Sequence, residues 1–178
     1  MNIFFTADTH LNHENIIKYC KRPFASAKEM NECIFDSWTG MVKNDDTIYH
    51  LGDVLWREPL HIVEKLKKLP GRKILIPGNH DNKLNLLAEV FEIAPPILEE
   101  KFLLNGERRE IVLCHYPMQS WNGSYGGSWH FYGHVHGRIE NSFQRLDVGV
   151  DSWNFQPVPL ELAAASIIVR PDNAHPRE

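Results

Sequence analysis

Residues 2–10 read Asn-Ile-Phe-Phe-Thr-Ala-Asp-Thr-His, an apolar run that ends in an acidic side chain and a histidine. The run from 2 to 6 is typical of a buried strand, and Asp8-Thr9-His10 is typical of the loop that follows one. The same order recurs at 47–53, which ends in Gly-Asp, and at 73–81, which ends in Gly-Asn-His-Asp. Because helical patterns separate these three runs, the first half of the chain predicts alternating strands and helices.

The second half reads differently, because two apolar runs flank Asn105-Gly106, a strong signal for a type I′ β-hairpin. Strands and helices that alternate in the first half, followed by hairpins in the second half, predict an α/β domain with two mixed sheets. Ser26 and Glu29 form a capping box for the longest helix. We expect strands at 2–6, 47–51, 73–76, 97–104, 109–113, 129–132, 146–150 and 166–169, and helices at 14–20, 26–41, 59–69, 83–90 and 159–165.

Length and composition indicate one globular unit. The chain has 178 residues, and we place a single domain at 1–170 and a polar tail at 171–178. Hydrophobic residues make up 43% and charged residues 24%, which excludes a disordered or fibrous chain. The net charge of −4 argues against a sequence-independent nucleic-acid coat and against a membrane-surface binder.

The expected setting is the cytoplasm. No apolar run is long enough to span a membrane, and no basic leader precedes the first apolar run. The three cysteines, an odd count without paired spacing, indicate a reducing compartment. The oligomeric state stays open at this point.

Metal-capable side chains gather at the predicted ends of strands, where α/β folds bind their ligands. Residues two apart in an extended segment point the same way, so Asp8 with His10, and His134 with His136, are expected to form two chelating pairs. The glycines of these motifs are expected to let the backbone turn sharply after each strand. The candidate metal ligands are Asp8, His10, Asp53, Asn79, His115, His134 and His136.

These candidate ligands offer oxygen and imidazole nitrogen, without thiolate. Such a set favours Mn, Fe, Co, Ni or Zn over Ca or Mg. Seven ligands are too many for one tetrahedral ion and fit two ions that share a bridging carboxylate. Two dications against the carboxylates of Asp8 and Asp53 leave a surplus of positive charge, which attracts an anion such as phosphate.

Five ordered motifs, Asp-x-His, Gly-Asp, Gly-Asn-His-Asp, a lone His and Gly-His-x-His, resemble the calcineurin-like metallophosphoesterases. The small size of the chain and the sequence of residues 8–17, Asp-Thr-His-Leu-Asn-His-Glu-Asn-Ile-Ile, resemble their compact, uncapped bacterial and phage branch. The resemblance implies two mixed sheets sandwiched between helices, in four layers, and two divalent transition-metal ions. Mn is the first choice, and Fe, Zn, Ni or Co are the alternatives. In this family pattern Asp8, His10 and His136 hold one ion, Asn79, His115 and His134 hold the other, and Asp53 is the bridge.

The resemblance also implies a reaction, in which a hydroxide between the two metals attacks phosphorus and His80 protonates the leaving oxygen. One position departs from the protein-phosphatase branch, whose motif is Gly-Asp-x-x-Asp-Arg-Gly. Trp56 replaces the second Asp, which in that branch orients the catalytic histidine. Asp81 is the substitute that we expect in this role, and Arg57 falls at the position of a phosphate-binding arginine. This departure makes a phosphoprotein substrate a weaker expectation.

Two further segments are candidates for contact with substrate. His13 follows His10 by three residues and either enters the same crevice or only starts a helix beside Glu14. Residues 121–129 hold three glycines and three aromatic residues. This loop either folds over the metals, with Trp121 and Tyr125 against the substrate or a nucleobase, or is a mobile surface loop.

The sequence therefore predicts a metal-dependent phosphoesterase that acts on a small phosphate mono- or diester, with a nucleotide as one candidate substrate. A nuclease for ends or single strands shares the chemistry, but the acidic net charge weighs against long polymers. A non-catalytic metal-binding interaction module of the same fold is the third hypothesis. The filled ligand positions argue against that module.

Overall fold

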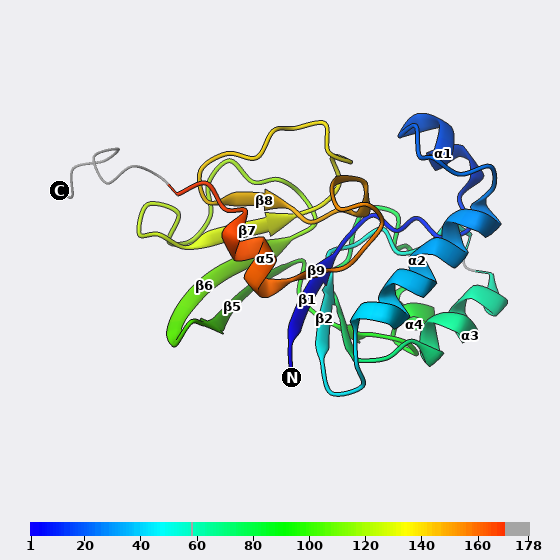
Figure 1. Ribbon diagram of the computed structural model, residues 1–178, viewed down its shortest axis with the longest axis horizontal. Coiled ribbons are helices and arrows are strands. Elements are labelled where there is room, and N and C mark those ends of the chain that lie inside the picture. The colour runs from blue at the N-terminus through cyan, green and yellow to red at the C-terminus, as the bar shows by residue number, and fades with distance from the viewer. Residues whose placement is uncertain (58, 170–178) are drawn as a thin grey trace.

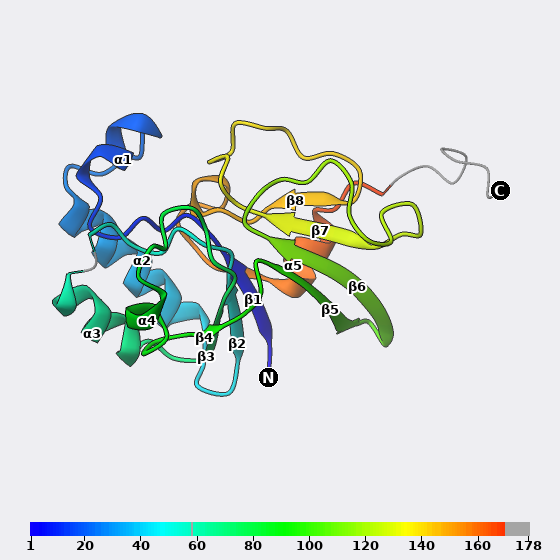
Figure 2. The same ribbon diagram turned by 180° about the vertical axis from the view of Figure 1, so that it is seen from behind.

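Two β-sheets face each other in the computed structural model, which describes residues 1–57 and 59–169 (Figures 1 and 2). This arrangement confirms the predicted class, an α/β fold with two mixed sheets and helices. The predicted domain boundary at 170 and the tail at 171–178 lie outside the described residues. Among the described residues, no helix combines the length and the apolar composition that a membrane crossing requires.

The first sheet has the strand order β4-β3-β2-β1-β9. Its strands are β1 (Ile3–Thr6), β2 (Thr47–His50), β3 (Arg72–Leu75), β4 (Glu92–Ile93) and β9 (Val158–Pro159). The first four run parallel, and β9 runs antiparallel to β1. Connections through helices place consecutive parallel strands side by side, as the alternating pattern of the first half predicts.

The second sheet has the order β5-β6-β7-β8. Its strands are β5 (Ile97–Leu104), β6 (Glu107–Cys114), β7 (Trp129–Tyr132) and β8 (Arg145–Asp147). Strands β6, β7 and β8 run parallel, and β5 pairs antiparallel with β6. Asn105 and Gly106 connect β5 to β6 with φ angles of 52° and 85°, so the predicted type I′ turn is confirmed.

The helices are α1 (Glu14–Tyr19), α2 (Ala27–Met41), α3 (Leu60–Lys68), α4 (Leu84–Leu87) and α5 (Leu160–Ala165), with a short 3₁₀ helix at Val150–Ser152. Helix α2 begins where the capping box predicts. The Ser26 hydroxyl accepts from the Glu29 amide at 3.2 Å, and the Glu29 carboxylate accepts from the Ala25 amide at 2.7 Å. The first bond satisfies an amide of the first helical turn, and the second ties the residue before the N-cap to that turn.

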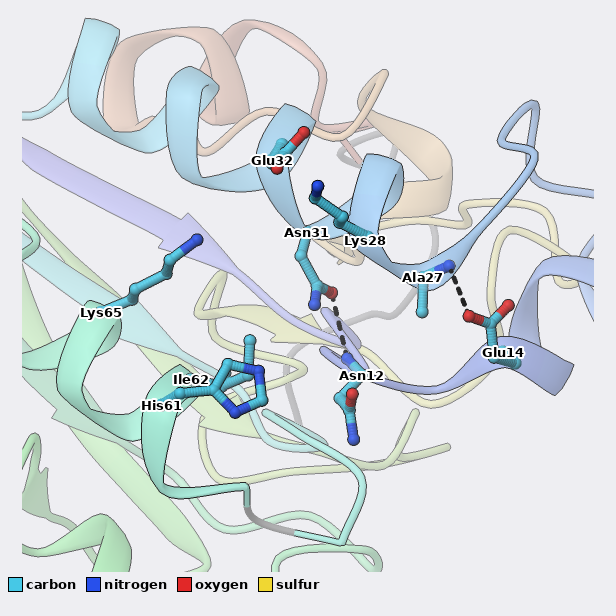
Figure 3. A pocket seen from close by; sticks show the side chains of 9 residues that line it. All are labelled: Asn12, Glu14, Ala27, Lys28, Asn31, Glu32, His61, Ile62 and Lys65. Carbon is cyan, nitrogen blue, oxygen red and sulfur yellow. Dashed lines mark hydrogen bonds between the residues drawn. The ribbon is translucent and has the colours of Figure 1, made fainter.

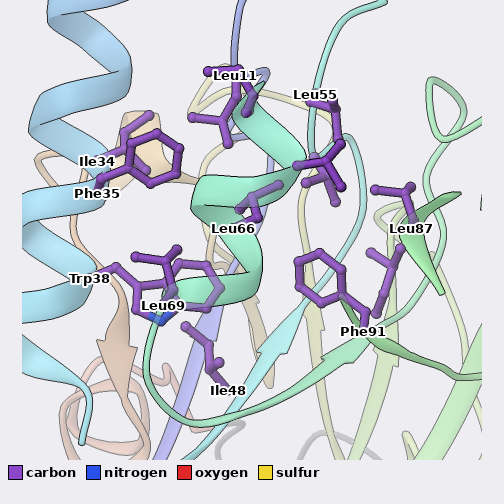
Figure 4. Close-up of a cluster of buried hydrophobic side chains, with 14 of the residues drawn as sticks. Leu11, Ile34, Phe35, Trp38, Ile48, Leu55, Leu66, Leu69, Leu87 and Phe91 are labelled. Carbon is purple, nitrogen blue, oxygen red and sulfur yellow. The ribbon is translucent and has the colours of Figure 1, made fainter. Parts of the chain in front are cut away.

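One hydrophobic core joins the helices to the first sheet. Trp38 and Phe35 of α2 and Leu66 of α3 pack against Ile48 of β2 (Figure 4). Helix α2 begins its apolar stripe at Ala27, and its buried positions recur at helical spacing. A second core lies between the two sheets, where Phe5 of β1 meets Phe131 of β7 edge to face at 4.9 Å.

The face of the second sheet that points away from the first sheet is covered by other means than the helices that cover the first sheet. His130 of β7 is buried there under Trp121, whose ring centroid lies 5.2 Å away. An irregular segment, and not a helix, therefore covers this part of the sheet. Helix α5 instead places Leu160 and Ala163 in the core between the sheets.

Several predicted elements differ from the structure. The strand predicted at 166–169 is wrong, because only Ile168 forms a bridge, and its partner is the lone residue Phe143. The strand predicted at 146–150 ends at Asp147, since the chain turns into the 3₁₀ helix. The helix predicted at 83–90 spans only 84–87. Strands β4 and β9 were not predicted, because two residues show no periodicity.

Candidate metal centre

The candidate ligands lie where parallel strands of both sheets end. Strands β1, β2 and β3 of the first sheet and β6 and β7 of the second each lead directly into one of the five motifs. Ala7, just after β1, bridges to Gly149, just after β8, so the ends of the two sheets are joined beside the motifs. Strands that end at a common crevice place their loop residues in one site.

The structure brings the seven predicted ligands together in two groups. Asp8, His10 and His136 form the first group, and Asp53, His115 and His134 form the second, each with ligand atoms within 4.8 Å of one another. Asn79 joins the second group, since its Oδ1 atom lies 3.0 Å from Nε2 of His115. The division into two groups is the one that the family resemblance implies.

Asp53 connects the two groups. Its Oδ2 atom lies 3.4 Å from Nε2 of His10 and 3.6 Å from Nε2 of His115. Its Oδ1 atom accepts a hydrogen bond of 2.8 Å from the His80 amide, which fixes the carboxylate plane. One oxygen of a buried carboxylate therefore faces both groups at once, as a ligand shared by two cations must.

The first group has buried polar atoms that a cation would satisfy. Within the described chain, Oδ1 of Asp8 and both ring nitrogens of His10 have no hydrogen-bond partner. Burial raises the pKa of Asp8 well above its usual value and lowers the pKa of His10. Orphaned buried polar atoms are costly, and a neutral imidazole offers a lone pair to a metal. The residues present therefore fit a divalent cation.

Hydrogen bonds turn two histidines toward the centre. Nδ1 of His115 donates to the Leu51 carbonyl at 2.7 Å, which leaves Nε2 facing Asp53. Nδ1 of His136 lies 2.8 Å from Oδ2 of Asp151. Although burial lowers the pKa of His136, the hydrogen bond to Asp151 raises it to about 10. A metal binds the neutral ring, so it must displace one proton of the protonated imidazole. Outer partners such as Asp151 fix the orientation of ligating histidines.

Arg22 and Asp151 also belong to the site, although their sequence context was not used to predict them. The buried Arg22 guanidinium donates to both carboxylate oxygens of Asp151, at 2.8 and 2.7 Å, and to the Asp8 carbonyl at 2.7 Å. It therefore ties the loop after β1 to the loop after β8. The signal for Asp151 was available, because it follows a strand and a glycine as the other motifs do, whereas Arg22 carries no such signal.

The local backbone explains why one pairing expectation fails. Five of the seven candidate ligands have left-handed φ angles: Asp8 57°, His10 44°, Asp53 59°, His134 70° and His136 51°. The premise of an extended segment therefore does not hold. Asp8 and His10 still share a group, but His134 and His136 belong to different groups. Such backbone is unfavourable outside glycine and is found where a site requires it.

The motif glycines act in two ways. Gly52 turns the chain with a φ angle of 89°, as expected. Gly78 and Gly133 are needed instead for close approach. A Cβ atom on Gly78 would overlap Oδ1 of Asp53, and one on Gly133 would lie 2.5 Å from Oδ2 of Asp8. These two glycines let the carboxylates of the site sit directly against neighbouring backbone.

Asp81 has a different role from the one expected. Its Oδ2 atom accepts from the amides of Asp53 and Gly78, both at 2.8 Å, and its Oδ1 atom accepts from the Val54 amide at 2.9 Å. The carboxylate thus joins the loop after β2 to the loop after β3 and is not directed at the ring of His80. That ring is 38% exposed, and its Nε2 atom lies 3.9 Å from Oδ2 of Asp53.

The predicted substrate residues differ in how near they lie to the two ligand groups. His13 is buried, with its ring centroid 5.5 Å from that of His10, so it borders the first group. Arg57 is exposed. Trp121 donates its indole N–H to Oγ of Ser128, just before β7 begins, whereas the ligand His134 follows the end of β7. The structure therefore places Trp121 at the far end of β7 from the centre; Tyr125, in the same loop, is 72% exposed.

Tyr116 borders the second group and was not predicted. Its ring centroid lies 4.8 Å from His134 and 5.1 Å from His115, and the residue is 46% exposed. The buried His130 anchors this segment, since its Nε2 atom accepts from the Met118 amide at 3.0 Å. The tyrosine follows His115 directly, but an aromatic residue after a ligand is no specific signal.

A separate cavity lies between α2 and α3, outside the two groups (Figure 3). Its volume is ≈ 310 Å³, and it is lined by Asn12, Glu14, Ala27, Lys28, Asn31, Glu32, His61, Ile62 and Lys65. No candidate metal ligand lines it, and its lysines and glutamates balance in charge. At its floor the Asn12 amide donates to Oδ1 of Asn31 at 3.0 Å.

Together, two facing sheets with a cluster of oxygen and nitrogen donors at their strand ends define an α/β protein with a candidate metal centre. Residues 1–138 match the family model of the calcineurin-like phosphoesterases. The chain belongs to this family.

Relatives of this chain include proteins from archaea, bacteria and phages. An uncharacterized protein of Methanocaldococcus jannaschii, MJ1445, is 32% identical over 90% of this chain and 88% of its own length. The gene 66 protein of Mycobacterium phage L5 is 25% identical over 85% of this chain and 87% of its own length. The crystal structure of AQ665, a protein of unknown function from Aquifex aeolicus, has a TM-score of 0.71 at 27% identity, covering 89% of this chain and 95% of that one.

Proposed function

We propose that this protein hydrolyses small phosphate mono- or diesters with two divalent transition-metal ions. Asp8, His10 and His136 would hold one ion, Asn79, His115 and His134 would hold the other, and Asp53 would bridge them. Mn is the first choice of metal, with Fe, Zn, Ni or Co as alternatives. Bound ions of this kind supply Lewis-acid activation of the ester and of the attacking water.

The observation that carries the proposal is the position of Asp53. Its Oδ2 atom, 3.4 Å from one histidine nitrogen and 3.6 Å from another, faces both groups of ligands. A single structural ion needs no shared carboxylate, whereas paired ions that clamp a phosphoryl group use one. Family membership supports the same reaction class.

The proposed role of His80 is to protonate the leaving oxygen. Its backbone is fixed by the bond from its amide to Oδ1 of Asp53, and its half-exposed ring borders the centre. A histidine in this position can be reached by substrate from solvent while staying next to the ligands. General acid catalysis by a positioned side chain requires this combination.

The test is hydrolysis by metal-reconstituted protein across a panel of phosphomonoesters, phosphodiesters, cyclic nucleotides and short oligonucleotides. We expect turnover of small esters that disappears with chelator and returns with Mn²⁺. Cleavage of oligonucleotides alone, with an affinity that falls steeply with salt, would favour the nuclease. No turnover of any ester by protein that holds two ions would favour the non-catalytic module.

A cytoplasmic location is also proposed, supported by the free thiols of Cys20, Cys33 and Cys114.

A further inference from the structure

We propose that Trp56 is a positioning residue for His80. It holds the imidazole by aromatic packing at the place where the protein-phosphatase pattern has a carboxylate. This inference rests on the proposed function, because it concerns the group that would protonate the leaving oxygen. It follows from the contacts of three rings, those of His13, Trp56 and His80.

Trp56 lies between the two histidines. Its ring stacks on His13 with a centroid distance of 4.3 Å and an interplanar angle of 8°. It meets His80 in an edge contact, with centroids 5.5 Å apart and an angle of 63°. Aromatic pairs prefer these two geometries, offset stacking and edge to face. The three rings therefore form a continuous wall beside the first ligand group.

The indole is itself held in place. The Trp56 amide donates to the Leu11 carbonyl at 2.8 Å, and the Trp56 carbonyl accepts from Nδ2 of Asn12 at 3.3 Å. His13 is buried on the far side of the stack. Because both the backbone and one face of Trp56 are fixed, its contact with His80 occurs at a defined position.

His80 depends on such a support. Among residues 1–57 and 59–169, no hydrogen bond is made to its ring, and Asp81, the neighbour expected to orient it, is engaged by three backbone amides. The aromatic contacts of the His80 ring are with Trp56 and, at 5.4 Å, with His10, and its Nε2 atom lies 3.9 Å from Oδ2 of Asp53, which belongs to the ligand groups. His10 belongs to the ligand group, so Trp56 is the neighbouring ring that has no other proposed task.

The test is a double-mutant cycle with Trp56→Ala and His80→Ala, measured as kcat on an alkyl phosphate ester. In the wild-type background, Trp56→Ala should lower kcat by about 10²-fold, the scale of a 1 Å misplacement. In the His80→Ala background it should change kcat by no more than a few-fold, because residues that act as one unit are not additive. Trp56→Phe, which keeps an aromatic edge, should restore most of the activity.

Tyr19→Ala is the matched control. Tyr19 meets His13 at 6.4 Å from the outside, so its removal takes away an aromatic contact of the same cluster without touching His80. We expect unchanged kcat for this variant and unchanged metal content for all variants. An equal loss from Trp56→Ala in both backgrounds would show a general structural role and overturn the proposal.

A measurement without substrate separates this inference from the proposed function. Nuclear Overhauser effects between the ring protons of Trp56 and His80 should be present in wild type, and Trp56→Ala should give an averaged His80 ring signal. If wild type hydrolyses no ester, the proposed function fails, and the Overhauser contact alone decides the positioning. The absence of that contact, or a His80 signal unaffected by Trp56→Ala, would overturn the positioning.

Discussion

Asp53 is the residue that faces both groups of candidate ligands. Asp53→Asn should remove most of the bound metal, because a neutral amide offers one oxygen and no charge to two cations. The bond from the His80 amide needs only a carbonyl oxygen, so the loop itself should remain folded. Elemental analysis after reconstitution measures the loss. Asp45→Asn, at a carboxylate that is 73% exposed near the N-terminus, should keep full metal content.

Replacement of His80 should affect kcat and not metal content, unlike replacement of Asp53. We expect His80→Ala to retain its metals and to lose kcat by about 10² to 10⁴ for alkyl esters, the usual worth of general acid catalysis. The loss should be smaller for p-nitrophenyl esters, because that leaving group departs without a proton. The check is kcat across leaving groups of graded pKa. An equal loss for all of them would mean that His80 stabilises the phosphate, and His13 would become the candidate acid.

The sequence predicts which candidate ligands come together better than it predicts their surroundings. The seven candidate ligands could be predicted because each follows a strand; six lie in a motif with glycine or a second polar residue, and His115 stands alone. Asp81 was misjudged, because sequence adjacency to His80 says nothing about where its carboxylate points. Arg22 and Tyr116 could not be predicted, since their contacts come from segments that only the fold brings together.

At the scale of elements, two glycines should respond oppositely to alanine. Gly106 has a φ of 85° in the β5–β6 turn, so Gly106→Ala should cost about 1–2 kcal/mol in the free energy of unfolding. Gly40 lies inside α2 with open space where a Cβ atom would project, so Gly40→Ala should stabilise by about 0.5–1 kcal/mol. Urea unfolding of both variants compares them. The same sign for both would contradict these two conformations.

The anchoring of the segment after β6 should depend on pH. Burial lowers the pKa of His130 to about 4, and its unfolded value is about 6.5. The unfolded chain therefore binds a proton first as pH falls, and stability that is present above pH 6.5 is lost toward pH 4. One such proton contributes a slope of about 1.4 kcal/mol per pH unit.

His130→Gln should reduce the slope of unfolding free energy against pH by about this amount between pH 6 and 4.5. Other titrating groups, such as His50 with a pKa lowered by burial to about 3, contribute equally to both proteins and cancel in the comparison. Urea unfolding at several pH values gives the two slopes. Identical slopes would show that His130 is protonated in the folded protein.

Secondary structure followed from periodicity wherever an element was long. Helix α2 and the β5–β6 hairpin could be predicted from a capping box and a turn dipeptide, both of which act locally. Residues 166–169 look like a strand because three of the four are apolar and β-branched, but Ile168 and Val169 stay 45% and 70% exposed. Pairing needs a neighbouring strand, and local sequence does not report whether one is present.

At the scale of the whole molecule, the two sheets bring their parallel strand ends together, which local patterns could not predict. The alternation in the first half and the hairpin in the second half together predict two mixed sheets. That the two sheets place Asp53 between both ligand groups was implied only by the family resemblance. The bridge from Ala7 to Gly149 and the Arg22–Asp151 pair are among the contacts that join the halves beside the site.

In the proposed function, one chain of this protein holds two metal ions. The most direct measurement is elemental analysis of purified protein reconstituted with Mn²⁺ and freed of excess metal, set against protein concentration from amino-acid analysis. We expect two ions per chain in wild type, since Asp53 faces two separate groups of candidate ligands. One ion per chain, or none, would contradict it.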